Sequence, residues 1–453
     1  MPRLNDTIAA LATPAGTAAI AVVRVSGPDT ARLGRDLFGE LPPPRTLRRA
    51  DYRTVGGAVV DDILFTYFQA PHSYTGEDSL EVSCHGNPFI AQKILEDFFA
   101  RGCRPADPGE FTQRAFLNSR MDLSQAEAVM DLIHARSDRA LAAANQQLRG
   151  SLGRRMDALV HVLLGVLARV EAYIDFPDED LPSEDRAIVA RELESIASET
   201  GGLLATSHFG EMLRDGIKTV ILGAPNAGKS SLLNCLVGKS RALVSPEPGT
   251  TRDFIEERII VGSHCLRIID TAGLNPSPTP LERLGMEKTF ERATEADLLL
   301  LVFDSAAPVQ NLPGEIIRKA RSCKSLIVFN KSDLNSIPTP PAGLGLDQIR
   351  SLHVSALTGA GIDALTFAIQ ELANEFQSSV GSELIAINAR HSHALAQARE
   401  CLAEAQSKLS LDAPIELLAS DLRGTLAAFE GICGKIDNER MLDALFATFC
   451  IGK

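Results

Sequence analysis

The stretch Gly223-Ala224-Pro225-Asn226-Ala227-Gly228-Lys229-Ser230 decides the fold. It fits the pattern G-x-x-x-x-G-K-[ST], whose glycines let the backbone curl until successive N–H groups face a phosphate. Residues 218–223 before it predict a short buried strand, and residues 230–237 after it predict a helix, whose N-terminus favours anions. Lys229 would reach the outer phosphates, and the Ser230 hydroxyl would hold Mg²⁺. The stretch therefore predicts a strand–loop–helix unit that binds the phosphates of a nucleotide.

A second motif, Asp270-Thr271-Ala272-Gly273, follows the predicted strand 265–269. The carboxylate of Asp270 can hold Mg²⁺ through water, and the N–H group of Gly273 can meet a γ-phosphate. The motif thus supplies the groups that a hydrolysed triphosphate needs.

The base is expected to be chosen by Asn330-Lys331-Ser332-Asp333, which follows the predicted strand 326–329. A carboxylate at Asp333 accepts two hydrogen bonds from the N1–H and N2 amino edge of guanine. Adenine presents an acceptor there, so the carboxylate would stay unpaired, and such a site discriminates strongly. Ser355-Ala356 closes a third strand and could offer a backbone N–H to guanine O6. Four such motifs in this order predict a domain that binds and hydrolyses GTP.

Composition and charge indicate which classes of protein this chain can belong to. The 453 residues carry a formal net charge of −13, which excludes binding to nucleic acid through overall charge, so an RNA site would be a local patch. The eight cysteines are scattered without C-x-x-C pairs, which favours free thiols over a zinc or disulfide framework. We see no signal-peptide pattern and no apolar run long enough to span a bilayer, so we expect a cytoplasmic protein without membrane contact.

Residues 1–118 are expected to form a mixed α/β domain, in which the proline- and arginine-rich segment 42–53 predicts a loop. Two polar stretches, 73–78 and 108–114, stand out. Glycine followed by acids is typical of a turn with a helix cap, and that interpretation is favoured over a functional one. The expected strands are 18–25 and 62–69, and the expected helix is 91–100.

The composition then shifts to Ala, Leu, Glu and Arg, which predicts the first part of a helical domain in residues 119–215. Ser124-x-x-Glu127 predicts a capping box that opens its first helix. Residues 216–377 alternate strand and helix, as a doubly wound parallel sheet should. Helical composition returns in residues 378–453. The simplest architecture is therefore one helical domain interrupted by an inserted GTPase domain.

Six arginines make the first helical part locally basic. The favoured interpretation is a solvated helix face, and the alternative is a patch that faces RNA. These residues are Arg120, Arg136, Arg139, Arg149, Arg154 and Arg155.

Four groups of short motifs carry a resemblance to a known family. They are Asp6-Thr7-Ile8 with Ala12-Thr13-Pro14 and Arg24-x-Ser26-Gly27; the stretch 108–114 with Ala115-Phe116-Leu117-Asn118 and Gln125-Ala126-Glu127-Ala128; Gly249-Thr250-Thr251-Arg252-Asp253; and the tail Phe449-Cys450-Ile451-Gly452-Lys453. Over nearly its whole length the chain resembles the MnmE (TrmE) family of GTPases, which act in the modification of the wobble uridine of tRNA. The resemblance implies a Ras-like P-loop GTPase domain and an N-terminal domain that folds like a folate-binding domain.

The resemblance also implies partners and chemistry. Residues 1–118 would form a homodimer that binds a tetrahydrofolate derivative, 5-formyl or 5,10-methylene, through Arg24, Glu81, Arg120 and Lys453; the family often carries lysine at the position of Arg120. The partner MnmG would join as a heterotetramer and supply FAD. Together they would add an aminomethyl or carboxymethylaminomethyl group to C5 of the uridine in tRNA. Cys450 is a candidate for direct chemistry, although a cysteine in a tail is also simply a small hydrophobe.

Ras-like GTPases carry a glutamine that orients the attacking water, and Leu274 stands at that position in this sequence. Another residue must therefore orient the water for GTP cleavage. The resemblance points to Glu282, acting through water, as the catalytic residue, and the other interpretation of Glu282 is a surface helix acid. It also points to K⁺ held near Asn226 by Ser245, Glu247 and Thr250, with Mg²⁺ held by Ser230 and Thr251. The remaining predicted GTP contacts are Ala227, Gly228, Lys229, Ser231, Pro246, Pro248, Gly249, Asp270, Thr271, Ala272, Gly273, Asn330, Lys331, Asp333, Ser355, Ala356 and Leu357.

Two functions from different classes remain open on the sequence. One is a subunit of a tRNA-modifying enzyme whose GTP hydrolysis drives a conformational cycle. The other is a GTP-gated RNA-binding switch, such as an assembly factor, without modification chemistry. The folate-like domain and the Cys-x-Gly-Lys tail favour the first, since a plain switch needs neither.

Overall fold

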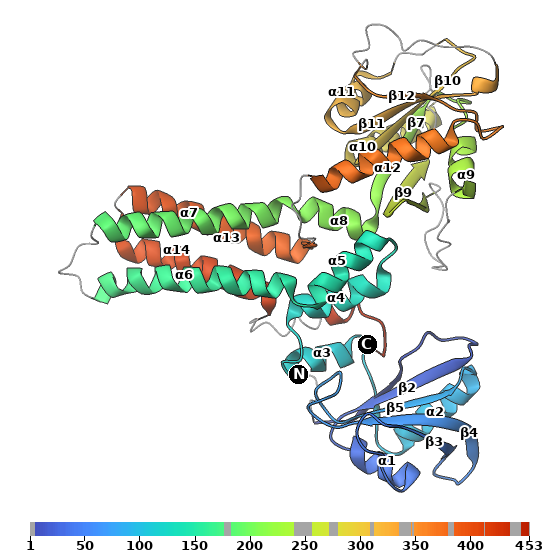
Figure 1. Cartoon of the computed structure of the whole chain (residues 1–453), viewed down its shortest axis with the longest axis vertical. Coiled ribbons are helices and arrows are strands. Elements are labelled where there is room, and N and C mark those ends of the chain that lie inside the picture. The colour runs from blue at the N-terminus through green and yellow to red at the C-terminus, as the bar shows by residue number, and fades with distance from the viewer. Residues whose placement is uncertain are drawn as a thin grey trace. The chain divides into compact units, whose positions relative to one another are not determined.

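The chain divides by its internal contacts into two compact units in the computed structural model (Figure 1). The first unit comprises Met1–Met130, Leu148–Leu164 and Leu426–Lys453, and the second comprises Asp131–Gln147 and Gly165–Thr425. This division cuts through long helices, so the segment boundaries expected at residues 118, 215 and 377 stay predictions. The structure describes residues 5–175, 183–239, 256–270, 280–308, 312–334, 346, 348–378, 385–411, 413–434 and 445–452.

A six-stranded sheet in the order β3-β4-β5-β2-β1-β6 forms the core of the first unit. Neighbouring strands are antiparallel, except that β1 and β6 are parallel. Because successive side chains in a strand point to opposite faces, Val23 of β2 and Leu80 of β5 enter one apolar cluster with Phe98 of helix α2. The elements are β1 Ile8–Leu11, β2 Ile20–Ser26, α1 Thr30–Phe38, β3 Leu47–Arg53, β4 Val59–Phe68, β5 Ser79–His85, α2 Pro88–Ala100 and β6 Arg104–Pro105.

The predicted loop at residues 42–53 is wrong for its second half. Leu47–Arg53 forms strand β3, which pairs with β4 at the edge of the sheet. Tyr52 is fully buried and donates a hydrogen bond of 3.0 Å to Oδ2 of Asp97, while Arg48 and Arg49 face solvent. An exposed edge strand tolerates such charges, and they hinder pairing with another sheet. Arginine content was therefore no sign of a loop here.

The predicted capping box at Ser124 and Glu127 is wrong by two residues. Helix α4, Leu123–His134, is preceded by Asp122, whose Oδ1 accepts a hydrogen bond of 2.8 Å from the Gln125 backbone N–H. In return, Oε1 of Gln125 accepts one of 2.9 Å from the Asp122 backbone N–H. Ser124 lies in the first turn, and its hydroxyl donates to Asp122. Asp122 and Gln125 thus make the reciprocal cap.

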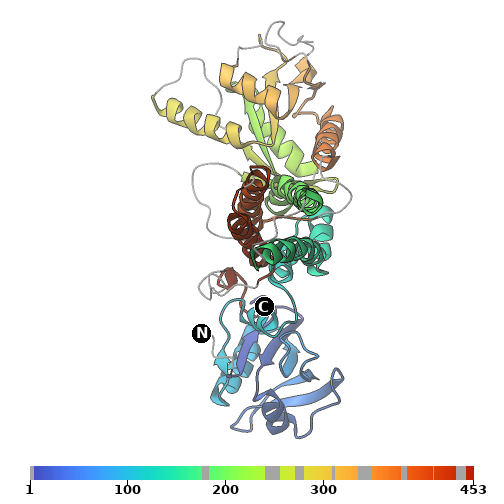
Figure 2. The same ribbon diagram turned by 90° about the vertical axis from the view of Figure 1, so that its left-hand side faces the viewer.

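The second unit contains a six-stranded sheet in the order β12-β11-β10-β7-β9-β8, flanked by helices (Figure 2). All neighbouring strands are parallel except β8 and β9. Side chains of β10 alternate between a cluster with α9 and α12 and a second cluster with α10 and α11. Because β10 is buried on both faces, its sequence is continuously apolar. A mostly parallel sheet with helices on both faces is the doubly wound arrangement that the sequence predicted. The elements are β7 Ile217–Gly223, α9 Lys229–Lys239, β8 Glu256–Val261, β9 His264–Asp270, α10 Pro280–Glu295, β10 Leu298–Asp304, α11 Gly314–Ser322, β11 Lys324–Asn330, β12 Ser351–His353 and α12 Ile362–Ser378.

Helices that precede the second sheet in the sequence pack against helices that follow it. Helices α7 and α13 lie side by side in both views (Figures 1 and 2), and Gln406 donates a hydrogen bond of 3.0 Å to Glu194. Leu193 and Leu402 on these helices are fully buried. Such packing is what an interrupted helical domain requires. The remaining helices are α3 Glu110–Leu117, α5 Asp138–Leu148, α6 Ser151–Asp175, α7 Ser183–Ala205, α8 Ser207–Asp215, α13 Ala389–Ser410 and α14 Ile415–Cys433. In the described part of the chain, no helix combines the length and apolarity needed to cross a membrane.

Candidate functional site

The predicted phosphate loop lies between β7 and α9. Asn226 and Gly228 take left-handed backbone conformations, with φ of 62° and 86°, which curl the chain at this point. The Lys229 side chain is buried, and its Nζ donates to the carbonyl oxygens of Gly223 at 3.2 Å and Ala224 at 3.0 Å. The ammonium group therefore sits inside the loop, where a bound phosphate would take over its hydrogen bonds.

Two glycines of the loop are required by close approach. A Cβ atom at Gly223 would lie 2.2 Å from the carbonyl oxygen of Val302 on the neighbouring strand. A Cβ at Gly228 would lie 2.3 Å from Nδ2 of Asn330. A side chain at Gly223 would push the loop away from the neighbouring strand, and one at Gly228 would displace the Asn330 amide and strain the left-handed backbone, so the pattern of the motif has a steric cause.

The predicted base-binding residues meet the phosphate loop through Asn330. Its Nδ2 donates to the carbonyl oxygen of Ala227 at 3.0 Å, and its Oδ1 accepts from the backbone N–H of Ala356 at 3.0 Å. Asp333 accepts a hydrogen bond from the Ser355 hydroxyl at 2.5 Å. Asn330 thus joins the loops that follow three strands at one edge of the sheet, where ligands of such sheets bind.

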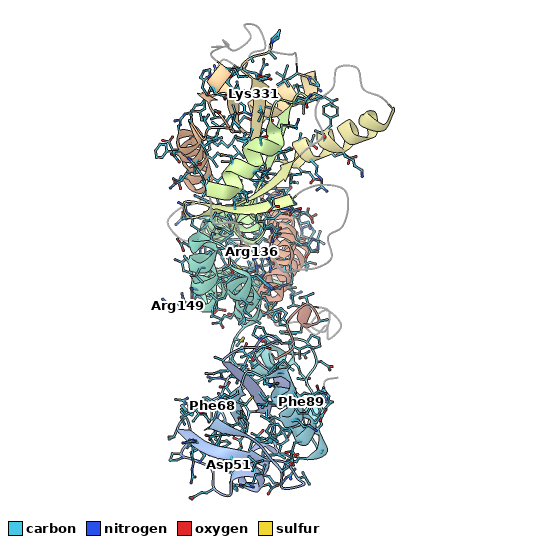
Figure 3. All side chains as sticks on the ribbon, turned by 90° about the vertical axis from the view of Figure 1, so that its right-hand side faces the viewer. Asp51, Phe68, Phe89, Arg136, Arg149 and Lys331 are labelled. Carbon is cyan, nitrogen blue, oxygen red and sulfur yellow. The ribbon has the colours of Figure 1, made fainter. Side chains whose placement is uncertain are left out.

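Lys331, labelled in Figure 3, stands between these residues with a left-handed φ of 63°. Its Nζ pairs with Oδ2 of Asp304 at 2.7 Å. Burial would raise the pKa of Asp304, but the hydrogen bond and positive charge of Lys331 and the hydrogen bond from the Ala306 backbone together hold the pKa below its usual value. The ammonium is therefore anchored, and its methylene stem can cover one face of a bound base.

The described residues fit a guanine nucleotide, with a phosphate cradle at one end and a carboxylate at the other. Ser230 and Ser231 at the start of α9 are exposed, as Asn226 is, and the Leu357 side chain is 86% exposed. Several predicted contacts lie outside the described residues: Ser245, Pro246, Glu247, Pro248, Gly249, Thr250, Thr251, Thr271, Ala272, Gly273 and Lys453. Asp270 ends β9 and Glu282 belongs to α10, and the structure describes only their backbones.

The first unit brings together most of the residues expected around folate. Arg24 of β2 and Glu81 of β5 are directly opposite in the sheet register, and their ion pair is 2.8 Å long. The Arg24 guanidinium also donates to the carbonyl oxygen of Gly452 at 3.4 Å and lies 5.3 Å from the ring centroid of Tyr74. A half-buried cation at an aromatic wall is suited to a flat, anionic ligand.

The C-terminal tail is fixed in the same unit. Gly452 has a φ of 93°, and a Cβ on it would lie 2.2 Å from the carbonyl oxygen of Leu11. The carbonyl oxygen of Cys450 accepts a hydrogen bond of 3.3 Å from the Gly109 N–H, while its thiol is free and exposed. Arg120 is exposed and its stem packs near Gly76. The tail that follows the last described helix is thus held by backbone contacts that sequence reasoning missed.

A buried ionic network joins the two polar stretches that were interpreted as turns. The fully buried Arg114 pairs with Asp6 at 2.6 Å, Glu110 at 2.9 Å and Glu77 at 3.3 Å. Burial would lower the pKa of Arg114, but these carboxylates outweigh it and raise the pKa. Arg104 adds ion pairs to Glu110 and Asp6. The sequence shows acidic residues in one stretch and an arginine in the other, but their spacing along the chain does not reveal that they form ion pairs.

The six arginines of the helical region have different environments. Arg139 donates to the Ser263 hydroxyl at 2.9 Å and to Oδ1 of Asn374 at 3.0 Å, so it links α5 to the turn between β8 and β9 and to helix α12. Arg149 is exposed, and Arg136 is half-buried. A uniform solvated face does not describe them, because Arg139 is a structural link.

Comparisons with known proteins agree along the whole chain. A family model described as "MnmE helical domain" matches residues 123–450, and one described as "GTP-binding protein TrmE N-terminus" matches residues 7–120. The tRNA modification GTPase MnmE of Opitutus terrae is 58% identical over 457 residues and 100% of both chains. That of Akkermansia muciniphila is 43% identical over 99% of both. A solved variant of Era from Aquifex aeolicus, bound to GDP·AlF₄⁻, is 28% identical over 34% of this chain and 56% of that chain, with a TM-score of 0.27 that is too low to carry an argument. The chain belongs to the family of the tRNA modification GTPase MnmE.

Proposed function

We propose that this protein hydrolyses GTP as one subunit of a complex that modifies tRNA at C5 of the wobble uridine. One observation carries the GTP part of the proposal: Asn330 ties the phosphate loop at Ala227 to the loop of Ala356, with Asp333 beside it. That arrangement presents a phosphate cradle and a guanine-selective carboxylate to one ligand. The tRNA part rests on membership of the family, whose relatives carry the name tRNA modification GTPase.

Hydrolysis would use Mg²⁺ and K⁺ held by this chain. The exposed hydroxyl of Ser230, with Thr251, would bind Mg²⁺, which neutralises charge that develops on the phosphates. Asn226 is exposed in the phosphate loop and offers a neutral oxygen to K⁺, with Ser245, Glu247 and Thr250 as further ligands. Glu282 would position the attacking water, because Leu274 has no group that can do so.

The one-carbon unit would come from 5-formyl- or 5,10-methylenetetrahydrofolate in the first unit. Arg24 and Glu81 would orient it at the wall formed by Tyr74, with Arg120 and Lys453 as further cations. The proposal includes a homodimer of this chain in the cytoplasm, with MnmG bringing FAD and completing a heterotetramer. The product carries an aminomethyl or carboxymethylaminomethyl group, and Cys450, exposed beside the docked tail, is the nucleophile we assign to the tail.

The test is the wobble uridine itself. Cells that lack this protein should show unmodified uridine at the wobble position by mass spectrometry of their tRNA, and the wild-type gene should restore the modification. A Cys450→Ser gene should not restore it, while a gene with Cys401→Ser, a half-buried thiol on α13, should. Fully modified wobble uridine in the deletion strain would reject the modification role and leave a GTP-gated RNA switch as the function.

A further inference from the structure

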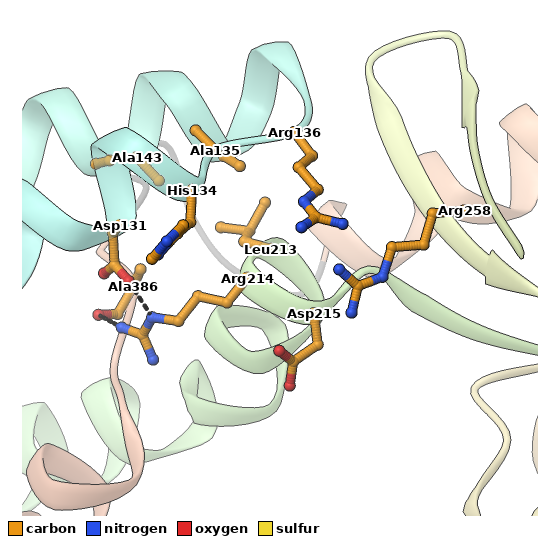
Figure 4. Close-up of a pocket in the computed structure, with 12 residues that line it drawn as sticks. Asp131, His134, Ala135, Arg136, Ala143, Leu213, Arg214, Asp215, Arg258 and Ala386 are labelled. Atoms are coloured by element: carbon orange, nitrogen blue, oxygen red, sulfur yellow. Dashed lines mark hydrogen bonds and ion pairs between the residues drawn. The ribbon is translucent and has the colours of Figure 1, made fainter. Parts of the chain in front are cut away.

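A cavity of about 300 Å³ in the second unit belongs to none of the sites described above. It lies between the turn that joins α4 to α5, the end of α8 and strand β8 (Figure 4). Half of its lining residues are alanines and Leu213, and its size is at the lower end of the range for small-ligand pockets. The polar lining consists of Asp131, His134, Arg136, Arg214, Asp215 and Arg258.

One of the three arginines is already satisfied by the protein. The Nε of Arg214 donates to Oδ1 of Asp131 at 2.8 Å, and its Nη2 donates to the carbonyl oxygen of Ala386 at 3.4 Å. Figure 4 shows this guanidinium turned toward those two partners. Arg214 and Asp131 therefore form a neutral wall of the cavity.

The other two arginines differ from Arg214. The Nη1 atom of Arg136 is buried, and no described residue accepts a hydrogen bond from it. Arg258 lines the same cavity, and its guanidinium forms no ion pair with a carboxylate of the described residues. Figure 4 shows the two guanidinium groups pointing toward one another across the cavity. Both also oppose the rise that burial imposes on the pKa of the Cys265 thiol, as two cations converging on one place would.

Two like charges that face each other in a half-buried cavity repel, and a buried guanidinium nitrogen without an acceptor is costly. Asp215 lines the same cavity, but it is exposed and forms no ion pair with either guanidinium. The charge that would balance Arg136 and Arg258 is therefore an anion from outside the described chain.

We propose that this cavity binds a phosphate group, held between Arg136 and Arg258. Guanidinium groups present planar forks that match the oxygens of a phosphate in a bidentate way, and two of them from opposite sides satisfy a tetrahedral anion. The cavity is larger than one phosphate, so the group belongs to a phosphate ester, either a small molecule or the backbone of an RNA. His134 at the wall can donate a further hydrogen bond.

The site would join two parts of the second unit. Arg136 follows α4, whereas Arg258 lies on β8 of the six-stranded sheet. A phosphate between them replaces repulsion across the cavity with two charge-assisted contacts, so occupancy stabilises the contact between the helices and the sheet.

The experiment uses the full chain saturated with GDP, so that the phosphate loop is filled. Inorganic phosphate, ribose 5-phosphate and a twelve-nucleotide RNA are titrated by calorimetry at constant ionic strength. Arg136→Gln and Arg258→Gln should each weaken binding of inorganic phosphate about tenfold, the loss expected for one charge-assisted contact. Arg191→Gln, a change at an exposed arginine on α7, should leave binding unchanged.

The same titrations separate the two sources. If ribose 5-phosphate binding falls in both cavity variants and RNA binding does not, the ligand is a small ester. If RNA binding falls and its salt dependence becomes shallower by about one in each variant, the ligand is an RNA phosphate. Absence of saturable binding by any of the three probes, or equal binding by both variants and the wild type, overturns the proposal.

Thermal unfolding gives a second readout that does not depend on identifying the ligand. Without phosphate, both glutamine variants should melt at or above the wild-type temperature, because each removes a repelled cation. Phosphate should raise the wild-type melting temperature more than that of either variant. Variants that melt well below wild type in phosphate-free buffer would show that the arginines have protein partners, and the site would not exist.

Discussion

Asn330 donates a hydrogen bond of 3.0 Å from its side-chain amide to the carbonyl oxygen of Ala227. The two residues are far apart in the sequence, yet this contact and the bond from the Ala356 N–H to Asn330 lock three loops into one edge of the sheet. The side-chain amide both donates and accepts hydrogen bonds inside the site. A nucleotide that binds here meets loops that are already arranged, which lowers the ordering cost of binding.

Asn330→Ala should therefore weaken GTP binding, because it removes the contacts that hold these three loops together. Loss of two to three hydrogen bonds, at about 1 kcal/mol each, predicts a decrease in affinity of about thirtyfold to about 150-fold. Titration with a fluorescent GTP analogue measures it. Asn145→Ala, at a half-buried asparagine of α5 whose side chain donates to the Leu141 carbonyl oxygen of its own helix, is the control and should bind normally. Unchanged affinity in the Asn330 variant would mean that the loops are held by other contacts.

Asp333→Asn should switch the preferred base. An amide cannot accept two hydrogen bonds from guanine, but it can pair with xanthine, which carries an oxygen where guanine has its amino group. We expect GTP affinity to fall and XTP affinity to rise in competition assays. Asp363→Asn, which removes an exposed partner of Lys239, should keep the wild-type preference. Wild-type GTP affinity with no gain for XTP would show that Asp333 does not read the base.

GTP hydrolysis should be much faster in KCl than in NaCl at equal ionic strength. A cavity sized for K⁺ between Asn226 and carbonyl oxygens would place positive charge beside the β–γ bridge, where charge develops during phosphoryl transfer. Asn226→Ala should remove most of the difference between the salts with little loss of nucleotide affinity. Steady-state phosphate release in the two salts measures this effect, and equal rates for the wild-type protein would contradict it.

Glu282→Ala should lower the rate of GTP hydrolysis by about a hundredfold or more, as loss of a water-positioning or acid–base group does, while GTP binding stays intact. Glu291→Ala on the same helix is a matched control, because Glu291 is exposed and is not one of the predicted nucleotide contacts. A Glu282 variant with the wild-type rate would return Glu282 to the role of a surface acid.

Folate binding should depend on the contact between Arg24 and the C-terminal tail at Gly452. Arg24→Ala and deletion of residues 451–453 should each weaken binding of 5-formyltetrahydrofolate about tenfold, because each removes charged or docking contacts at one wall. GTP hydrolysis should be largely intact in both. Arg35→Ala, at an exposed arginine of α1, is the control for charge. Unchanged folate affinity by calorimetry in both variants would place the folate elsewhere.

Acid stability should depend on the network around Arg114. Burial would raise the pKa of Glu110, but hydrogen bonds from Arg104, the Asp107 backbone and Arg114 outweigh it and hold the pKa below its usual value. A lowered folded-state pKa stabilises the protein above the unfolded value of about 4.3, and that contribution is lost as the pH falls through the folded pKa.

Glu110→Gln should accordingly destabilise the protein by about 3 kcal/mol at pH 7, since it breaks a buried ion pair. The difference from wild type should shrink below pH 4. Urea unfolding at several pH values measures it, with Glu96→Gln, an exposed acid of α2, as the control. A difference that stays constant from pH 7 to pH 3 would mean that Glu110 is not ionised in the folded protein.

The sequence predicted elements well where one local pattern decides them. Strand β7, the phosphate loop and helix α9 follow from glycine spacing and an apolar run, because backbone curvature and burial are local demands. Strand β3 was missed, since an exposed edge strand carries the charges that also mark loops. The cap of α4 was misplaced because aspartate and serine are equally good caps, and only the backbone bonds of Asp122 and Gln125 decide between them.

The sequence by itself determined the chemistry of the nucleotide site and the family, since motifs of fixed spacing carry both. The tertiary structure decided which distant residues meet. It alone joins Asn330 to Ala227, places Gly452 against Arg24, pairs Arg114 with Asp6 and turns Arg136 toward Arg258. These contacts depend on sheet register and helix packing, which are set by the burial of the whole core, and no local pattern of residues encodes them.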